Sequence, residues 1–151
     1  MVSPLSEFGG EERFAASPEK LLSLLTDLDA LPAIIPDLVS SEKADPQTLK
    51  CVVRPGFSFL RGTMRLSIRL VESHPPESAT LGVTAQGIGV SMNLCSRLNV
   101  SADGSGSCLN WKATVDELKG LITAVSPTLI QAAADQVIRH AWSQVRKQLG
   151  E

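Results

Sequence analysis

The side chains best suited to nucleophilic or metal chemistry are three cysteines and two histidines, and their spacing favours neither reaction. Cys51, Cys95 and Cys108 are odd in number and form no Cys-x-x-Cys pair, which disfavours a full disulfide set and a thiolate metal site. His74 lies in a Ser-His-Pro-Pro sequence, far from His140 and without a convincing Cys or Asp partner. We therefore predict reduced thiols packed in strands, with no catalytic residue, no metal site and no cofactor.

Two further polar side chains are candidates for contact with a ligand. Glu12 shares strand parity with Phe8 and Phe14, so it could point inward as an acid; a bent or solvated position near the strand end is the favoured alternative. Trp111 offers an indole N–H and is equally an ordinary core aromatic or a ligand contact. The sequence has no tyrosine, so a phenol is not available as a polar handle.

Composition and charge indicate one globular domain over residues 1–151 that does not bind nucleic acid. Hydrophobic residues make up 43% of the chain and charged residues 20%, and the net charge is −2. The basic residues are scattered rather than clustered. Arg65 and Arg69 would share one face of a strand, which is more typical of a solvated sheet face than of an anion site.

Targeting signals and membrane spans are not evident in the sequence. No apolar run approaches the ~20 residues that cross a bilayer, and the N-terminus lacks a basic region followed by a hydrophobic stretch. Together with reduced thiols, this predicts a cytoplasmic protein. Peripheral contact with a membrane and the oligomeric state are left open.

The N-terminal part of the chain predicts one strand followed by short helical segments. The strand covers residues 5–15. Ser17 next to Pro18 indicates a helix start, because serine accepts a hydrogen bond from an unpaired backbone N–H and proline lacks the N–H that would go unused there. Pro32 and Pro36 then break the chain into short turns.

The central part of the chain alternates apolar and polar residues, as half-buried strands do. Turn sequences at residues 73–76 and 103–106 separate the alternating runs. Short links between consecutive strands predict an antiparallel meander rather than a parallel sheet. Strands are predicted over residues 49–59, 64–72, 79–88, 89–101 and 107–118.

A long helix is predicted at the end of the chain. Ser126-Pro127 repeats the Ser-Pro start, and helical periodicity continues from there to Leu149. A short helical turn is predicted just before it, over residues 121–125. The apolar stripe expected to face the sheet consists of Ile130, Ala134, Val137, Ala141 and Val145, flanked by Ala133 and Ile138.

Several fragments occur in the order found in one protein family. They are Phe8-x-Gly10, Phe14-x-x-Ser17-Pro18-Glu19, Leu25-x-Asp27, Pro36, Gly62, Glu72-Ser73-His74-Pro75-Pro76, Gly87-x-Gly89, Trp111 and Lys119-Gly120-Leu121. The chain thereby resembles, over nearly its whole length, the carbon-monoxide-dehydrogenase G-subunit family of the START and birch-pollen-allergen (SRPBCC) superfamily. This resemblance implies an α+β helix-grip fold. In that fold a curved antiparallel sheet of about six or seven strands wraps a long C-terminal helix, with two short helices after the first strand.

The resemblance also implies binding of a hydrophobic small molecule. Members of the superfamily hold lipids, quinones, polyketides or plant hormones in a cavity under the long helix, and some catalyse cyclisation or dehydration there. The G-subunit proteins are linked to the support of a molybdenum CO dehydrogenase, with membrane attachment and quinone handling proposed. Some carry an apolar C-terminal anchor; this sequence ends at Glu151 without one, which argues against such an anchor.

A strongly bent sheet cannot press every inward side chain against one helix, so bulky residues, water or a ligand must fill the remaining space. Small residues are frequent at the predicted inward positions, with larger apolar residues around them. The alternative is that the alanines only let helix and sheet approach closely, which would leave a dry core. The predicted cavity lining is Ile34, Ile35, Phe57, Phe59, Met64, Leu66, Val83, Ala85, Met92, Leu94, Leu98, Trp111, Ala113, Ile130, Ala133, Ala134, Val137 and Ala141.

The leading hypothesis is a non-catalytic protein that binds or carries a lipid or a quinone-like molecule, in support of a redox enzyme complex. One rival is an enzyme of the polyketide cyclase or dehydratase kind, which needs a buried ionisable residue facing the cavity. The other is an assembly factor for a larger oxidoreductase, which needs an exposed apolar patch.

Overall fold

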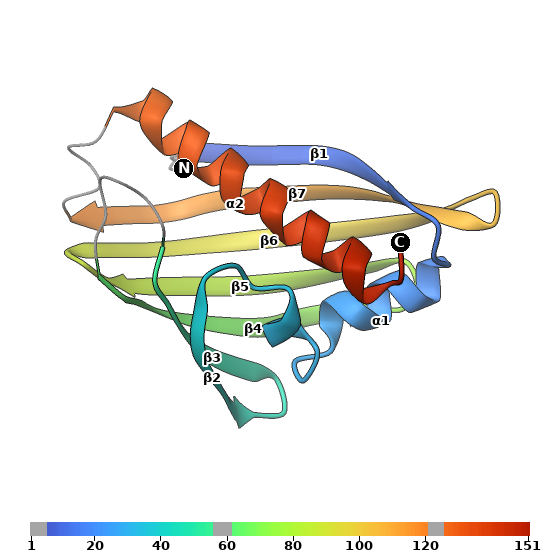
Figure 1. The fold of residues 1–151 in the computed structure, drawn as a ribbon, viewed down its shortest axis with the longest axis horizontal. Helices are drawn as coiled ribbons and strands as arrows, with labels where there is room; N and C mark the ends of the chain where they lie inside the picture. The colour runs from blue at the N-terminus through green and yellow to red at the C-terminus, as the bar shows by residue number, and fades with distance from the viewer. Residues whose placement is uncertain (1–5, 56–61, 121–125) are drawn as a thin grey trace.

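Seven antiparallel strands form one sheet in the part of the chain that the computed structural model describes, residues 6–55, 62–120 and 126–151. Their order in the sheet is β1-β7-β6-β5-β4-β3-β2 (Figure 1). The strands are β1 (Ser6–Phe14), β2 (Leu38–Asp45), β3 (Thr48–Val53), β4 (Met64–His74), β5 (Ser78–Gly87), β6 (Val90–Asp103) and β7 (Gly106–Gly120). The helices are α1 (Pro18–Thr26), the 3-10 turn η1 (Leu31–Ala33) and α2 (Pro127–Gln148).

Both helices cover the same face of the sheet, and α2 crosses it diagonally (Figure 1). The C-terminal end of α2 lies beside α1, while its N-terminal end lies near the start of β1. This arrangement confirms the predicted antiparallel sheet with a long C-terminal helix. The turn predicted over residues 121–125 lies outside the described residues.

The strand register decides which side chains point toward α2, because successive residues of a strand point to opposite faces. Leu66, Ala85 and Met92 lie side by side in neighbouring strands on the face covered by the helices. Arg65 and Arg69 point away from it and are exposed, as predicted for a solvated face. The short links that join β4 to β5, β5 to β6 and β6 to β7 are those of the expected meander.

β2 is the strand that the sequence pattern did not predict. All of its residues except Leu38 are exposed, so the apolar alternation that marks a half-buried strand is missing. It is an edge strand whose charged side chains, such as Glu42 and Lys43, suit a free sheet edge. The strand predicted over residues 49–59 is observed as β3 up to Val53, and residues 56–61 lie outside the described part.

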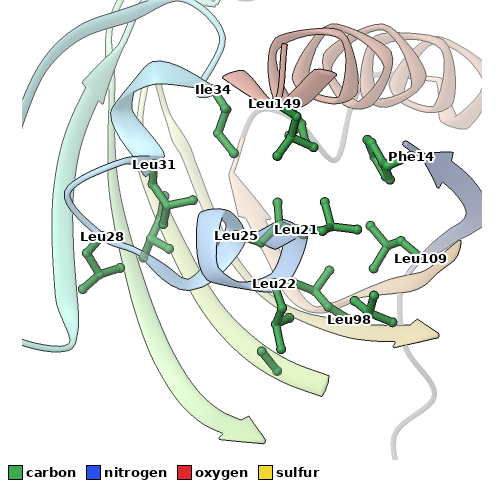
Figure 2. Close-up of a cluster of buried hydrophobic side chains, with 14 of the residues drawn as sticks. Phe14, Leu21, Leu22, Leu25, Leu28, Leu31, Ile34, Leu98, Leu109 and Leu149 are labelled. Carbon is green, nitrogen blue, oxygen red and sulfur yellow. The ribbon is translucent and has the colours of Figure 1, made fainter. Parts of the chain in front are cut away.

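The larger buried cluster lies where α1 meets the sheet and the end of α2 (Figure 2). Leu21, Leu22 and Leu25 project from α1 into this cluster, because spacings of three and four residues place them on one helix face. Leu109 of β7 and Leu149, just after α2, meet them from the other elements. This cluster therefore ties α1, the sheet and the C-terminal end of α2 together.

Two serine caps start the helices where the sequence predicts. The hydroxyl of Ser17 accepts a hydrogen bond from the backbone N–H of Lys20 at 3.3 Å. The hydroxyl of Ser126 accepts one from the backbone N–H of Leu129 at 3.2 Å. Each bond satisfies one of the donors that a helix N-terminus leaves unpaired.

Leu109→Ala should lower the free energy of unfolding by about 3 kcal/mol, because a buried leucine loses its transfer energy and leaves a cavity. Leu109 is 0% exposed, whereas Val39 of β2 is 55% exposed. Val39→Ala is therefore the control, with an expected change within about 0.5 kcal/mol. Urea unfolding followed by circular dichroism measures both, and equal losses would contradict this placement of the core.

Candidate ligand-binding site

α2 contacts a buried cluster near each of its two ends. At the C-terminal end Val145 is 0% exposed and belongs to the larger cluster, together with Leu149. At the N-terminal end Ile130 packs against a smaller cluster formed by Val53, Met64, Ala85 and Val90. The two contacts lie on one side of the helix, because 15 residues at 3.6 per turn bring Val145 to within about 60° of Ile130.

The middle of α2 is packed much less tightly than its ends. Ala134, Val137 and Ala141 continue the stripe between Ile130 and Val145, so they face the sheet. All three are only half-buried, and none belongs to either buried cluster. Small side chains at these positions leave the helix without contacts that would fill the space below it.

Two residues on the opposite surface of the sheet have the same character, whereas Val115, the strand partner of Leu94, is buried. Leu94 of β6 and Ala113 of β7 lie on the covered face, are half-buried and belong to neither cluster. Val83 lies beside Leu94, and Ser96 lies between Leu81 and Ala113. We call Ala134, Val137, Ala141, Leu94 and Ala113 the mid-helix region; it is apolar, and the hydroxyl of Ser96 is the polar group next to it.

The predicted lining residues fall into three groups. Phe57 and Phe59 lie outside the described residues. Ile34 and Leu98 are buried in the larger cluster, and Met64 and Ala85 in the smaller one. The remaining residues are half-buried: Ile35, Leu66, Val83, Met92, Leu94, Trp111, Ala113, Ile130, Ala133, Ala134, Val137 and Ala141.

The sequence analysis did not predict two residues that lie between the sheet and α2, Leu118 of β7 and Trp142 of α2. Leu118 lies beside Met92 because a bulge between the pairs of Asn93 and Leu94 adds one residue to β7 and reverses its parity. Trp142 was missed because it lies at the edge of the apolar stripe. Helical spacing from Ile138 was the signal available for it, since residues four apart are neighbours.

An aromatic cluster lies beside the C-terminal end of the mid-helix region. The rings of Trp111 and Trp142 lie 5.8 Å apart, and those of Phe14 and Trp142 lie 6.2 Å apart. Trp111 can lie against β1 because Gly10, directly opposite, has no side chain; an added Cβ would come within 3.2 Å of the indole nitrogen. The indole N–H of Trp142 is buried without a hydrogen-bond partner in the described structure.

Glu12 lies on the covered face, as its parity with Phe14 indicates, but at the rim rather than in the interior. Its carboxylate is 3.3 Å from the guanidinium of Arg146, and both side chains remain about one-third exposed, at 30% and 36%. The guanidinium also lies over the ring of Phe14 at 4.8 Å. Glu12 therefore lies in a partly solvated ion pair at the rim of the covered face.

A cleft of about 440 Å³ opens between β1 and α2, beside the mid-helix region. Phe8, Trp111, Ile138 and Trp142 form its apolar part. Phe8 lies directly opposite Ala113, so the cleft and the mid-helix region share a wall. Its polar rim is formed by Glu7, Glu11, Glu12, Gln131, Asp135 and Arg139.

The cysteines and histidines are not assembled into a reactive site within the described part of the chain. Burial raises the pKa of the Cys51 thiol, and burial followed by a hydrogen bond with Glu11 raises that of Cys108, so both are less ionised than a free cysteine. His74 contacts Glu72, whereas His140 contacts Gln144 of its own helix. Among these residues no group of three potential metal ligands comes together.

A family model for CoxG, the G subunit of carbon monoxide dehydrogenase, matches residues 10–150. The chain belongs to the CoxG family. No curated protein matches the sequence. In the described structure of this CoxG-family chain, no helix is long and apolar enough to span a membrane.

Solved structures share the fold of this CoxG-family chain at low sequence identity. A conserved protein from Geobacillus kaustophilus is 18% identical, with a TM-score of 0.88 over 96% of this chain and 95% of that one. A START superfamily protein from Mycobacterium smegmatis is 14% identical, with a TM-score of 0.70 over 94% and 95%. Ara h 8.0201 is 13% identical, with a TM-score of 0.71 over 97% and 99%. These similarities confirm the helix-grip fold predicted from the sequence.

The ion pair between Glu12 and Arg146 should contribute little to stability. A double-mutant cycle with Glu12→Gln and Arg146→Gln should give a coupling free energy of about 0.5 kcal/mol that shrinks in 1 M salt, because both groups are partly solvated. Urea unfolding of the four proteins measures this coupling. A coupling above about 2 kcal/mol that salt does not change would show that the pair is desolvated.

Proposed function

We propose that this protein binds or carries a hydrophobic small molecule, of lipid or quinone type, between the middle of α2 and the sheet. One observation carries the proposal: the apolar side chains of the mid-helix region are only half-buried and belong to neither cluster, although α2 contacts a buried cluster near each of its ends. The free energy of the system falls when an apolar ligand covers apolar surface of this kind, because that surface is removed from water.

The expected strength of binding follows from the area covered. A ligand that buries ~300 Å² of apolar surface gains roughly 7 kcal/mol before the cost of association, which removes several kcal/mol. Apolar contact alone therefore gives weak binding, and tighter binding needs a longer ligand or added hydrogen bonds. A long isoprenoid or acyl chain meets the first requirement.

The side chains around the mid-helix region favour a carrier over an enzyme. Its own side chains are apolar, and Glu12, the acid on the covered face of the sheet, is paired with Arg146 at the rim. In the described residues the buried polar side chain is Ser107, which lies opposite Phe14 and away from that region. An acid–base enzyme requires an ionisable group within hydrogen-bond reach of its substrate.

The family supplies the proposed partner. CoxG takes its name from carbon monoxide dehydrogenase, so we propose that the bound molecule supports the function of a CO-dehydrogenase-type oxidoreductase. A pure assembly factor is less favoured, because the exposed large apolar side chains in the described structure, Val39, Val71 and Leu129, belong to three different elements. A docking patch would gather such residues on one surface.

Ala134→Phe should weaken the binding of decylubiquinone about tenfold or more, because the ring occupies the space proposed for the ligand. Ala132→Phe, on the exposed side of the same helix, is the matched control and should bind normally. Quenching of tryptophan fluorescence reports binding, and the chain has two tryptophans and no tyrosine. Equal affinities of the two variants, or no binding by the unmodified protein, would overturn the proposal.

A further inference from the structure

A second cleft of about 430 Å³ continues the first one along the boundary between β1 and α2. The two clefts share Glu12, Arg139 and Trp142, so they meet at these residues and form one groove. We call this groove the β1–α2 seam, and the three shared residues its junction. The second cleft also includes Ser143, Arg146, Lys147 and Glu151.

Most charged groups of the second cleft already have partners. Arg146 is paired with Glu12 at 3.3 Å. The carboxylate of Glu151 accepts hydrogen bonds from the backbone N–H groups of Ala15 and Ala16 at 3.0 and 3.4 Å. The carboxylates that line this cleft are therefore occupied by groups of the protein itself.

Two cations of the second cleft lack such a partner. Arg139 donates from Nε to the backbone oxygen of Asp135 at 3.4 Å, and no carboxylate of the described residues lies within ion-pair distance of Arg139 or Lys147. The side chain of Asp135 instead accepts a hydrogen bond from Gln131 and lines only the first cleft. The second cleft is thus lined by three cations (Arg139, Arg146 and Lys147) and two carboxylates (Glu12 and Glu151), and Arg139 and Lys147 stand outside its ion pair.

The other side of the junction is apolar and leads toward the mid-helix region. Phe8 and Trp111 line the first cleft, and Phe8 lies opposite Ala113 of the mid-helix region. Trp142 lines both clefts, and its buried indole N–H has no partner in the described structure. An apolar wall on one side and two cations outside any ion pair of the described residues on the other match the two ends of an amphiphile.

We propose that the junction of the β1–α2 seam is a head-group site for an anionic amphiphile. Its carboxylate-like head lies beside Arg139, and its apolar tail runs past Phe8 and Trp111 into the mid-helix region. Arg139 suits this role because its guanidinium presents several N–H donors to a planar anion, and such charge-assisted hydrogen bonds are stronger than neutral ones. This inference rests on the proposed function, because the tail needs the space beneath α2.

Three probes with the same chain length test the site: decanoate, decanol and decylamine, each below its micelle concentration at pH 8. Tryptophan fluorescence is the readout, because Trp142 lies at the junction and Trp111 lies 5.8 Å from it. Decanoate should bind roughly tenfold more tightly than decylamine, the size expected of one charge-assisted hydrogen bond. Decanol reports the apolar contribution alone.

Arg139→Gln should lower the ratio of decanoate to decanol affinity roughly tenfold, because it removes the positive charge but keeps a polar side chain with part of the aliphatic chain. Arg139→Lys should keep part of that ratio. Arg69→Gln on the outer face of the sheet is the control and should leave it unchanged. Circular dichroism and the urea midpoint verify that each variant is folded.

The outcomes separate this inference from the function on which it rests. If decanol binds but the three heads are not distinguished, or if Arg139→Gln leaves the affinity ratio unchanged, the head-group site is wrong and the apolar site stands. If no probe binds the unmodified protein, the apolar site itself is wrong. Loss of decanoate selectivity in the Arg69→Gln control would show that charge acts at long range rather than at the junction.

Discussion

One packing constraint governs this structure: a straight helix can follow a curved sheet closely only where large side chains bridge the distance between them. Val145 and Leu149 provide that bridge at one end of α2, and Ile130 provides it at the other. Between them the helix presents two alanines and a valine toward the sheet. Contacts near the ends therefore hold the helix over the sheet while its middle packs less tightly, since protein interiors lose contacts wherever side chains fail to meet.

This constraint separates the part of the molecule that stabilises the fold from the part that is available to a ligand. The leucines of α1 join Leu98, Leu109 and Val145 in the larger cluster, at the C-terminal end of α2. The mid-helix region contributes little to either cluster, so its residues can change size at small cost to folding. Such a division is what a family needs if it is to vary its ligand while it keeps its fold.

The fold was predictable because its signals are local and independent. The Ser-Pro starts of both helices, the turn sequences at residues 73–76 and 103–106, and the alternation of β4 and β7 each specify one element. β2 escaped prediction because an exposed edge strand has no apolar alternation to reveal it. The side of the sheet to which Leu118 points was likewise not predictable, because a bulge reverses the parity of the strand and no residue type in the sequence marks its position.

The candidate site was predictable only in its apolar part. Helical and strand periodicity indicate which small residues face inward, and these include the residues of the mid-helix region. The polar groups of the β1–α2 seam depend on how two elements more than a hundred residues apart meet, which no local pattern encodes. Glu12 illustrates the difference: its parity placed it on the covered face, but only the position of Arg146 shows that it forms an ion pair there.

Selectivity in such a site has to come from its edge. An interior lined by carbon distinguishes ligands by volume and shape, and a difference of one methylene group changes affinity only modestly. Groups that recognise charge or hydrogen-bonding pattern lie at the seam, where Arg139 and Lys147 form no ion pair with the described residues. A molecule that enters tail first would therefore be chosen by its head, and the same edge exposes that head to a partner that receives or delivers the ligand.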